Sequence, residues 1–284
     1  MRLFVCLIAS MWALSVVAQS TLPVPSPAKP VYGRNARVGN YANIRGFRMY
    51  YETYGTGKPL LLIHGNGGSM NDFKNQIPFF ARNYQVIAVD SRAQGNSTDT
   101  SDSLTYEMMA DDFNALLNKL HLDSCYVIGW SDGGINGLLL AMRHPEKVKK
   151  LAVTGANLWP DTTAIDPSLF QWIVSMNDSL ARVQQTPAVK AQKKLLNLMI
   201  LHPHIETANL KKVHCPTLVI GGDHDVILPT HTLAIAEAIP QSYLWILPHS
   251  GHSTLIAYKD LFNQIVSDFF KTPYRSIKGM AKLN

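Results

Sequence analysis

The centre of the sequence, residues 125–143, reads CYVIGWSDGGINGLLLAMR. Its apolar beginning, Cys125–Gly129, is typical of a buried strand, and Asp132–Arg143 has the pattern of a helix. Between them, Gly129-Trp130-Ser131-Asp132-Gly133 fits G-x-S-x-G. A strand-to-helix turn this tight needs glycines beside the serine, and it lifts the serine hydroxyl clear of the sheet. We therefore predict that Ser131 is a nucleophile. A serine that serves only the turn explains this setting less well.

Strand-like and helix-like segments alternate on both sides of this stretch. The alternation predicts an α/β fold, with a mostly parallel sheet flanked by helices. The predicted strands are 47–54, 59–63, 85–89, 148–154, 217–221 and 243–247, and the predicted helices are 71–80, 105–120, 230–238 and 254–270. Residues 158–209 contain helix-like pieces at 168–176 and 187–201 but no convincing strand. We expect this stretch to form a helical cap inserted between two strands.

The N-terminus has the pattern of a secretory signal peptide. Arg2 is followed by an apolar run, Leu3–Val17, and small residues stand at the −3 and −1 positions before Gln19. We predict cleavage after Ala18 and a secreted or periplasmic protein; an N-terminal anchor helix is the alternative. No later apolar run approaches about 18 residues, so we expect no stable membrane insertion after signal removal. The predicted parts are a signal peptide 1–18, a Pro-rich linker or N-terminal extension 19–40, a core in two parts, 41–157 and 210–270, the cap 158–209, and a basic tail 271–284.

Composition and charge exclude several classes. Apolar residues make up 46% and charged residues 16% of the 284 residues, which excludes a disordered chain. The net charge of +6 comes from the ends of the chain, because residues 41–270 hold 18 basic and 20 acidic residues. Basic termini on a neutral body argue against nucleic-acid binding. After signal removal Cys125 and Cys215 remain, and we expect two separate buried thiols rather than one disulfide.

A serine hydroxyl needs a base and an orienting acid. For the base we choose His252 over His249; both lie between the last predicted strand and the last predicted helix. The acid should follow a strand between the serine and the histidine, where Asp223 and Asp225 stand on either side of one residue. We choose Asp225. Three adjacent residues cannot converge on one ion, so we expect no metal at this Asp-His-Asp, and no cofactor.

A glycine-rich loop, His64-Gly65-Asn66-Gly67-Gly68, follows the predicted strand that ends at residue 63. Such a loop lets the backbone approach an acyl carbon and stabilise a developing oxyanion. We predict the N–H groups of Asn66 and Asp132 as the donors and Gly67 as a substrate contact. A phosphate-binding loop is disfavoured, because the sequence has neither G-K-[ST] nor G-x-G-x-x-G with a ribose acid.

With these motifs, over roughly residues 40–270, the chain resembles the α/β-hydrolase superfamily of serine hydrolases. The stretch Asp90–Ser97 resembles the family loop D-x-R-G-x-G-x-S, with Ala93 where glycine is usual. Residues 129–135 together with Gly155-Ala156-Asn157 resemble the biphenyl-hydrolase-like, or valacyclovir hydrolase, group. That resemblance implies the α/β-hydrolase fold and cleavage of α-amino-acid esters. In that group the acid after the nucleophile recognises the substrate ammonium, and Asp132 occupies this position.

The expected activity is hydrolysis of a carboxylic ester through an acyl-enzyme, with a small-molecule ester as the partner. Asp132 either reads a substrate ammonium or caps the helix that begins there. The alternatives are a neutral carboxylesterase or lactonase and, less favoured, a non-catalytic ligand-binding member of the fold. Dehalogenase chemistry is disfavoured because the turn bears serine rather than aspartate. Further substrate contacts are expected at Asn157 and Trp159; the cap aromatics and Met199 either line an acyl pocket or pack the cap.

Overall fold

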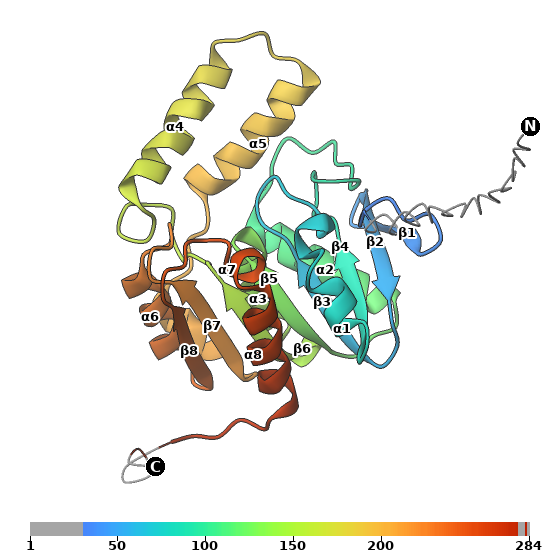
Figure 1. Cartoon of the computed structure of the whole chain (residues 1–284). Coiled ribbons are helices and arrows are strands. Elements are labelled where there is room, and N and C mark those ends of the chain that lie inside the picture. The colour runs from blue at the N-terminus through green and yellow to red at the C-terminus, as the bar shows by residue number, and fades with distance from the viewer. Residues whose placement is uncertain (1–30, 278–281, 283–284) are drawn as a thin grey trace, which may run out of the picture. The chain divides into compact units, whose positions relative to one another are not determined.

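A computed structural model describes residues 31–277 and 282. The predicted signal peptide and residues 19–30 of the predicted linker lie outside the described residues. The strands form one eight-stranded sheet in the order β1-β2-β4-β3-β5-β6-β7-β8 (Figure 1). The pairs β1–β2 and β2–β4 are antiparallel and the other pairs are parallel. The strands are β1 (Gly39–Ile44), β2 (Phe47–Tyr54), β3 (Lys58–Ile63), β4 (Tyr84–Val89), β5 (Cys125–Trp130), β6 (Val148–Thr154), β7 (Thr217–Gly222) and β8 (Ser242–Leu247).

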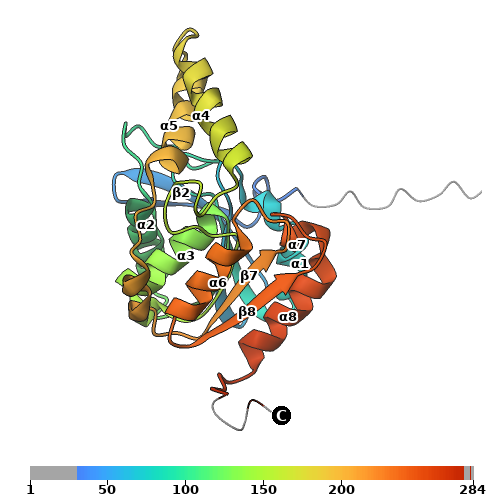
Figure 2. The same ribbon diagram turned by 90° about the vertical axis from the view of Figure 1, so that its left-hand side faces the viewer.

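Helices cover both faces of the sheet, as predicted (Figure 2). Strand β3 shows why: Leu61 and Ile63 enter one hydrophobic core, whereas Leu60 and Leu62 enter the other, because successive side chains of a strand point to opposite faces. The first core includes side chains of α2 (Tyr106–Lys119), α3 (Asp132–Arg143) and α6 (Pro229–Ala238). The second includes side chains of α1 (Ile77–Phe80) and α8 (Lys259–Lys271). None of the described helices is long and apolar enough to cross a membrane.

The predicted cap region holds two helices, α4 (Pro167–Ala181) and α5 (Pro187–Leu201), between β6 and β7. They run side by side and rise from one end of the sheet (Figures 1 and 2). Each begins with a side-chain cap followed by proline: the Asp166 carboxylate accepts from the N–H groups of Ser168 and Leu169, and the Thr186 hydroxyl accepts from that of Val189. The chain therefore forms the predicted helical cap between two strands.

Three local features differ from the sequence-based expectation. Strand β1 was not predicted, and it begins inside the predicted extension; a two-residue turn, Arg45-Gly46, with positive φ at both residues joins it to β2. The predicted helix 71–80 is a short 3-10 turn, Met70–Phe73, followed by α1, because Pro78 lacks the N–H that a continuous helix needs. The predicted helix 254–270 is interrupted at Tyr258, which separates α7 (Thr254–Ala257) from α8.

Cys125 and Cys215 are both buried free thiols. Cys125 begins β5, and Cys215 lies two positions before the start of β7. Strand β6 lies between these two strands in the sheet. Because both cysteines are free and buried, the expectation of two separate buried thiols is confirmed.

Candidate active site

Ser131 lies at the turn between β5 and α3 with a strained backbone. Its φ is 55° and its ψ is −120°, a conformation that residues other than glycine rarely adopt. A Cβ at position 129 would overlap the carbonyl oxygen of Gly133, and a Cβ at position 133 would overlap that of Ile63. Both flanking positions of G-x-S-x-G therefore require glycine, for the reason given by the sequence pattern. The turn holds the Ser131 side chain at the N-terminus of α3.

His252 and Asp225 come together from two loops at the same end of the sheet. Asp225 follows β7 and His252 follows β8, and the His252 Nδ1 atom lies 2.7 Å from Asp225 Oδ1. The Asp225 side chain is fully buried, and the same oxygen accepts the Ile227 N–H at 3.0 Å. The Trp130 indole N–H donates to the His252 carbonyl at 3.0 Å, which ties the histidine loop to the residue before Ser131. These contacts fix both the position and the orientation of the imidazole.

Asp223 and His249, the alternative acid and base, make other contacts than Asp225 and His252. The Asp223 carboxylate accepts the N–H groups of His249 at 3.0 Å and of Ser250 at 2.9 Å. Its Oδ1 also lies 2.8 Å from His224 Nδ1, and these bonds, led by the one from His224, hold the pKa of Asp223 well below its usual range. His249 is exposed. Asp223 therefore shapes the histidine loop, and the structure pairs His252 with Asp225.

The glycine-rich loop lies against the Ser131 side chain. A Cβ placed on Gly65 would be 3.2 Å from the Cβ of Ser131. His64 is buried and fixes the loop: it accepts the Ser91 N–H at 3.0 Å on Nε2, and its Nδ1 donates to the Gly65 carbonyl at 2.7 Å. Burial lowers the pKa of His64, which favours the neutral ring that these two bonds need.

The predicted oxyanion donors belong to this loop and to the first turn of α3. The first N–H groups of a helix have no partner within it, so the N–H of Asp132 is free of helical bonding beside Ser131. Asn66 follows Gly65 directly in the loop that contacts Ser131. The N–H of Gly67 instead donates to Gln94 Oε1 at 2.7 Å, which leaves this residue to line the cavity with its backbone.

The Asp132 side chain points away from its own helix. Its Oδ2 accepts from the Asn66 side-chain amide at 2.8 Å, and Tyr106 lies close enough to the carboxylate to oppose part of the rise in its pKa. The residue is only 4% exposed, and burial raises the pKa of Asp132 to about 6. Neither of these partners carries a positive charge. Tyr106, at the start of α2, was not predicted as a site residue, and the sequence marks it only as a helix position.

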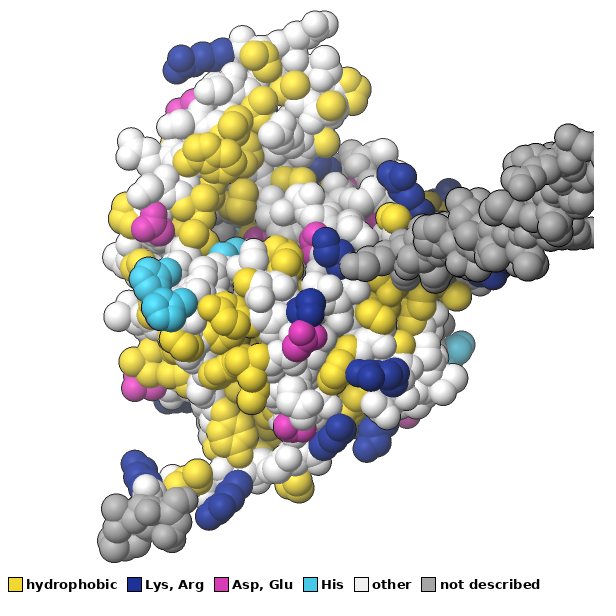
Figure 3. Space-filling model, in the orientation of Figure 1, with side chains coloured by type: hydrophobic (Ala, Val, Ile, Leu, Met, Phe, Trp, Pro, Cys, Tyr) yellow, Lys and Arg dark blue, Asp and Glu magenta, His cyan; other side chains and the backbone are white. Residues whose placement is uncertain are grey.

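Two cavities meet at Ser131 and His252. The larger has a volume of about 510 Å³ and lies under the cap, where Figure 3 shows hydrophobic side chains around a hollow. Its apolar wall comes from the cap residues Leu169, Trp172, Ile173, Leu195, Leu196 and Met199. The smaller, of about 50 Å³, is bordered by the polar side chains of Tyr106, Asp132, Asn157 and His202. His202 closes α5 and was not anticipated from the sequence.

Trp159 was expected to contact substrate, and the structure does not bring it to the site. It lines neither cavity. Its ring meets the edge of the His231 ring at 4.6 Å between centroids, and its indole N–H donates to the Thr163 hydroxyl at 2.8 Å. Asn157 does line the smaller cavity, while its amide donates to the Trp159 carbonyl at 3.0 Å. Among the described residues, no group of three or more His, Cys, Asp or Glu side chains is arranged to hold a metal ion.

Comparison with known proteins supports the same fold. A family model of the alpha/beta hydrolase fold matches residues 58–187. The chain has the α/β-hydrolase fold. It is 25% identical to the serine hydrolase BPHL of Mus musculus, over 80% of this chain and 84% of that protein. It is 27% identical to the 2-hydroxymuconate semialdehyde hydrolase of Pseudomonas sp. strain CF600, over 82% and 93% of the two chains.

Solved structures agree with this fold. An enol-lactonase from Burkholderia xenovorans superimposes with a TM-score of 0.69 at 20% identity, over 82% of this α/β hydrolase and 100% of that chain. A hydrolase from Pseudomonas aeruginosa superimposes with a TM-score of 0.70 at 20% identity, over 84% and 100% of the two chains. These similarities establish the predicted fold, and with the sequence relatives they show that this protein is a hydrolase.

Proposed function

We propose that this α/β hydrolase is a serine ester hydrolase with Ser131, His252 and Asp225 as its catalytic triad. The observation that carries the proposal is the 2.7 Å contact between His252 Nδ1 and the buried Asp225, beside the strained turn that presents Ser131. A carboxylate at Nδ1 holds the proton there and leaves Nε2 free to act as the base. A non-catalytic binder would have no need for this buried pair.

The reaction follows from these positions. The Ser131 hydroxyl attacks the ester carbonyl while His252 Nε2 accepts its proton. The N–H groups of Asn66 and Asp132 stabilise the oxyanion of the tetrahedral intermediate. His252 then gives the proton to the leaving alcohol, which leaves an acyl group on Ser131. A water molecule, deprotonated by the same imidazole, releases the acid and restores the serine.

A fluorophosphonate probe tests the nucleophile. It should label the protein, and Ser131→Ala should lose both labelling and turnover, because only the residual effect of the oxyanion hole and of binding, about 10³–10⁴ over water, survives the loss of a triad serine. Ser250→Ala is a matched control, because Ser250 is buried near His252 but lies outside the triad. Labelling that persists in Ser131→Ala would contradict the assignment.

For the substrate, we propose an ester with an α-ammonium group. A carboxylate roughly 6 Å from a developing oxyanion would destabilise it by about 3 kcal/mol at an effective dielectric near 20. The contacts of Asp132 with Asn66 and Tyr106 are with neutral groups, so they leave its charge uncompensated. An ammonium in the smaller cavity would supply the missing charge next to the scissile carbonyl. The resemblance of residues 129–135 to the biphenyl-hydrolase-like group, in which the acid after the nucleophile recognises the substrate ammonium, implies the same substrate class.

A neutral ester or lactone is the second candidate, and the apolar wall of the larger cavity favours it. A panel of aminoacyl esters, their N-acetyl forms, small neutral esters and lactones separates the two. A site that binds the substrate ammonium prefers the free aminoacyl ester over its N-acetyl form. Asp132→Ala should abolish that preference, while small neutral esters are still cleaved. Equal loss of all activities in Asp132→Ala would leave Asp132 with a structural role only.

Export of the protein is proposed from the sequence of its first 18 residues. The chain expressed with its own N-terminus should be recovered outside the cytoplasm with Gln19 as its first residue. N-terminal sequencing of the recovered protein checks this. Recovery of the intact chain, still beginning at Met1 and associated with the membrane, would favour the anchor helix instead.

A further inference from the structure

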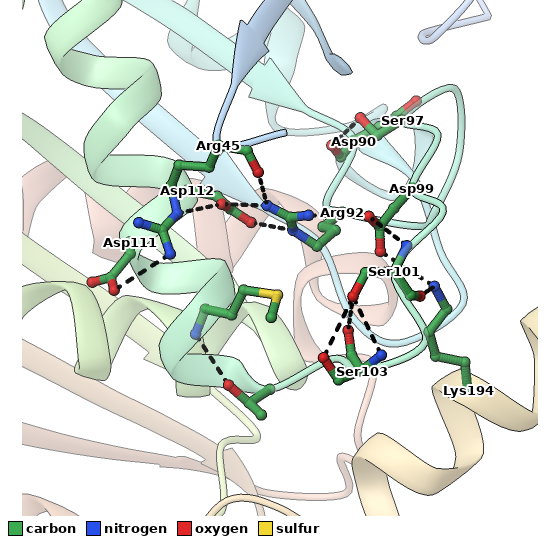
Figure 4. Close-up of polar contacts among 12 residues, drawn as sticks. Arg45, Asp90, Arg92, Ser97, Asp99, Ser101, Ser103, Asp111, Asp112 and Lys194 are labelled. Carbon is green, nitrogen blue, oxygen red and sulfur yellow. Dashed lines mark hydrogen bonds and ion pairs between the residues drawn. The ribbon is translucent and has the colours of Figure 1, made fainter. Parts of the chain in front are cut away.

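Helix α5 is attached to the sheet domain by a lysine. Lys194 Nζ lies 3.2 Å from Asp99 Oδ2 and also donates to the Ser101 carbonyl. The Lys194 side chain is only 15% exposed. Figure 4 shows it reaching from α5 to the loop that connects β4 and α2. This contact joins the cap to a part of the core that lies far from either end of the cap in the sequence.

The Asp99 carboxylate is buried and paired rather than exposed at the surface. Its side chain is 3% exposed, and it also accepts from Arg92 Nη1 at 3.0 Å. Arg92 in turn donates to Asp112 of helix α2 through Nε at 2.6 Å and Nη2 at 2.8 Å, and its guanidinium lies 3.8 Å from the centre of the Phe47 ring. A buried, paired and packed network of this kind holds its members in one geometry.

The next residue of α5 contacts the active-site loop. The Leu195 carbonyl accepts from the Asn66 side-chain amide at 3.2 Å. The same amide nitrogen donates to Asp132 Oδ2 at 2.8 Å. The Asn66 side chain thus links the glycine-rich loop, to which the residue belongs, with the cap and with the first turn of α3. Any movement of α5 relative to the core changes the acceptor geometry at Asn66.

Apolar packing holds the cap at a few points: Leu198 of α5 belongs to the first core and Leu195 packs against it. In α4 the only buried residue is Ile173, and in α5 the buried residues are Leu196 and Leu198. Most of each helix is partly or fully exposed, and the pair extends beyond the rest of the described chain (Figure 1). The polar contacts at residues 194 and 195 are therefore well placed to decide where α5 lies over Ser131.

We infer that Lys194 is a positioning residue for ester hydrolysis: its ion pair with Asp99 sets the position of α5, and the Leu195 carbonyl then holds Asn66 over the nucleophile. The inference rests on the proposed function, because it assigns the Asn66 backbone N–H to the oxyanion. Lys194 itself contacts neither of the cavities that border Ser131. Its effect on the reaction passes through the helix and the amide.

Substitution of Lys194 tests this in the full-length protein with 4-nitrophenyl acetate as the probe. Lys194→Met should lower kcat by about tenfold or more, because a misplacement of about 1 Å in an active site costs up to 10²-fold. Lys194→Arg keeps the charge and should recover most of the activity. Lys190→Met, an exposed lysine one turn earlier on the same helix, should stay within about twofold of the wild type. A Lys194→Met protein with a lowered Tm but an unchanged kcat would overturn the inference.

A double-mutant cycle examines the route through Asn66. Asn66→Ala removes the side-chain amide but keeps the backbone N–H, and we expect it to lower kcat. If Lys194 acts through Asn66, adding Lys194→Met to the Asn66→Ala variant should lower kcat little further. Fully additive losses would show that Lys194 does not act through Asn66.

Hydrogen exchange measured by mass spectrometry supplies a readout that needs no activity. Lys194→Met should speed exchange in the peptide 64–68 as well as in α5, whereas Lys190→Met should not. Faster exchange confined to α5 would overturn the inference even in a protein that cleaves no ester. Failure of the proposed function is recognised separately, by a wild-type protein that neither reacts with a fluorophosphonate nor hydrolyses any member of the ester panel.

Discussion

The imidazole of His252 contacts Asp225 at 2.7 Å, whereas the carboxylate two residues earlier, Asp223, binds the backbone of the histidine loop. Two acids in one short turn therefore have separate tasks. Asp225 is buried beside the imidazole, where it orients the ring. Asp223 lies near the surface, where it holds the loop that carries the ring.

The two acids should differ in their effect on catalysis. Asp225→Asn should lower kcat by orders of magnitude, approaching about 10⁴-fold, because an amide does not hold the tautomer that leaves Nε2 free. Asp223→Asn should cost far less, since it weakens only the support of the loop. Steady-state kinetics on one ester compares the two variants directly. A larger loss in Asp223→Asn would reverse the assignment of the acid.

The preference for an ammonium should depend on pH. Burial raises the pKa of Asp132 to about 6, so the group is protonated below this pH and charged above it. The ratio of kcat/KM for an aminoacyl ester to that for its N-acetyl form should therefore rise between pH 5 and 6.5. The ratio cancels effects that are common to both substrates, such as those of the base. In Asp132→Asn the ratio should be low and flat; a rise that persists in this variant would assign the titration to another group.

The same pKa shift predicts an effect on stability. The folded-state pKa of Asp132 lies above the value of about 3.9 in the unfolded chain, so the folded state loses stability as pH rises through this window. Asp132→Asn should therefore be more stable than the wild type at pH 7.5, by up to about 3 kcal/mol, and the difference should vanish below pH 4. Urea unfolding at several pH values measures it.

The control for this measurement is Asp260→Asn, at an exposed carboxylate on α8, which should change little at any pH. If Asp132→Asn were instead less stable than the wild type at pH 7.5, the carboxylate would contribute more through its hydrogen bonds than it costs by burial.

Trp172 should affect the binding of large apolar groups. It lines the larger cavity and is 55% exposed, so its removal should leave stability nearly unchanged. Trp172→Ala should raise KM for esters with a long apolar group by about tenfold, the equivalent of about 1.4 kcal/mol of lost contact, while short esters change little. Val183→Ala, an exposed cap residue that lines neither cavity, is the control. An equal rise in KM for short and long esters would argue against an apolar binding role.

Local chemistry explains what could be predicted from the sequence. The G-x-S-x-G turn, the order of strands and helices and the insertion of a cap all depend on patterns within a few residues of one another. Glycines 129 and 133 are required by contacts inside one turn and with the adjacent strand. The spacing of apolar residues indicates which segments are buried. The fold and the parallel sheet follow from these features.

Contacts between distant segments were decided only by the tertiary structure. The hydrogen bond from Asn66 to Asp132 links α3 to the glycine-rich loop, and Tyr106 of α2 borders the same small cavity. Sequence spacing left open whether this acid capped its own helix. The pairing of Lys194 with Asp99 joins residues 95 positions apart. Trp159 lies outside the cavities, with its ring against that of His231 of α6. Spacing along the chain predicts neighbours within a turn, but the packing of separate elements selects which polar side chains meet in the interior.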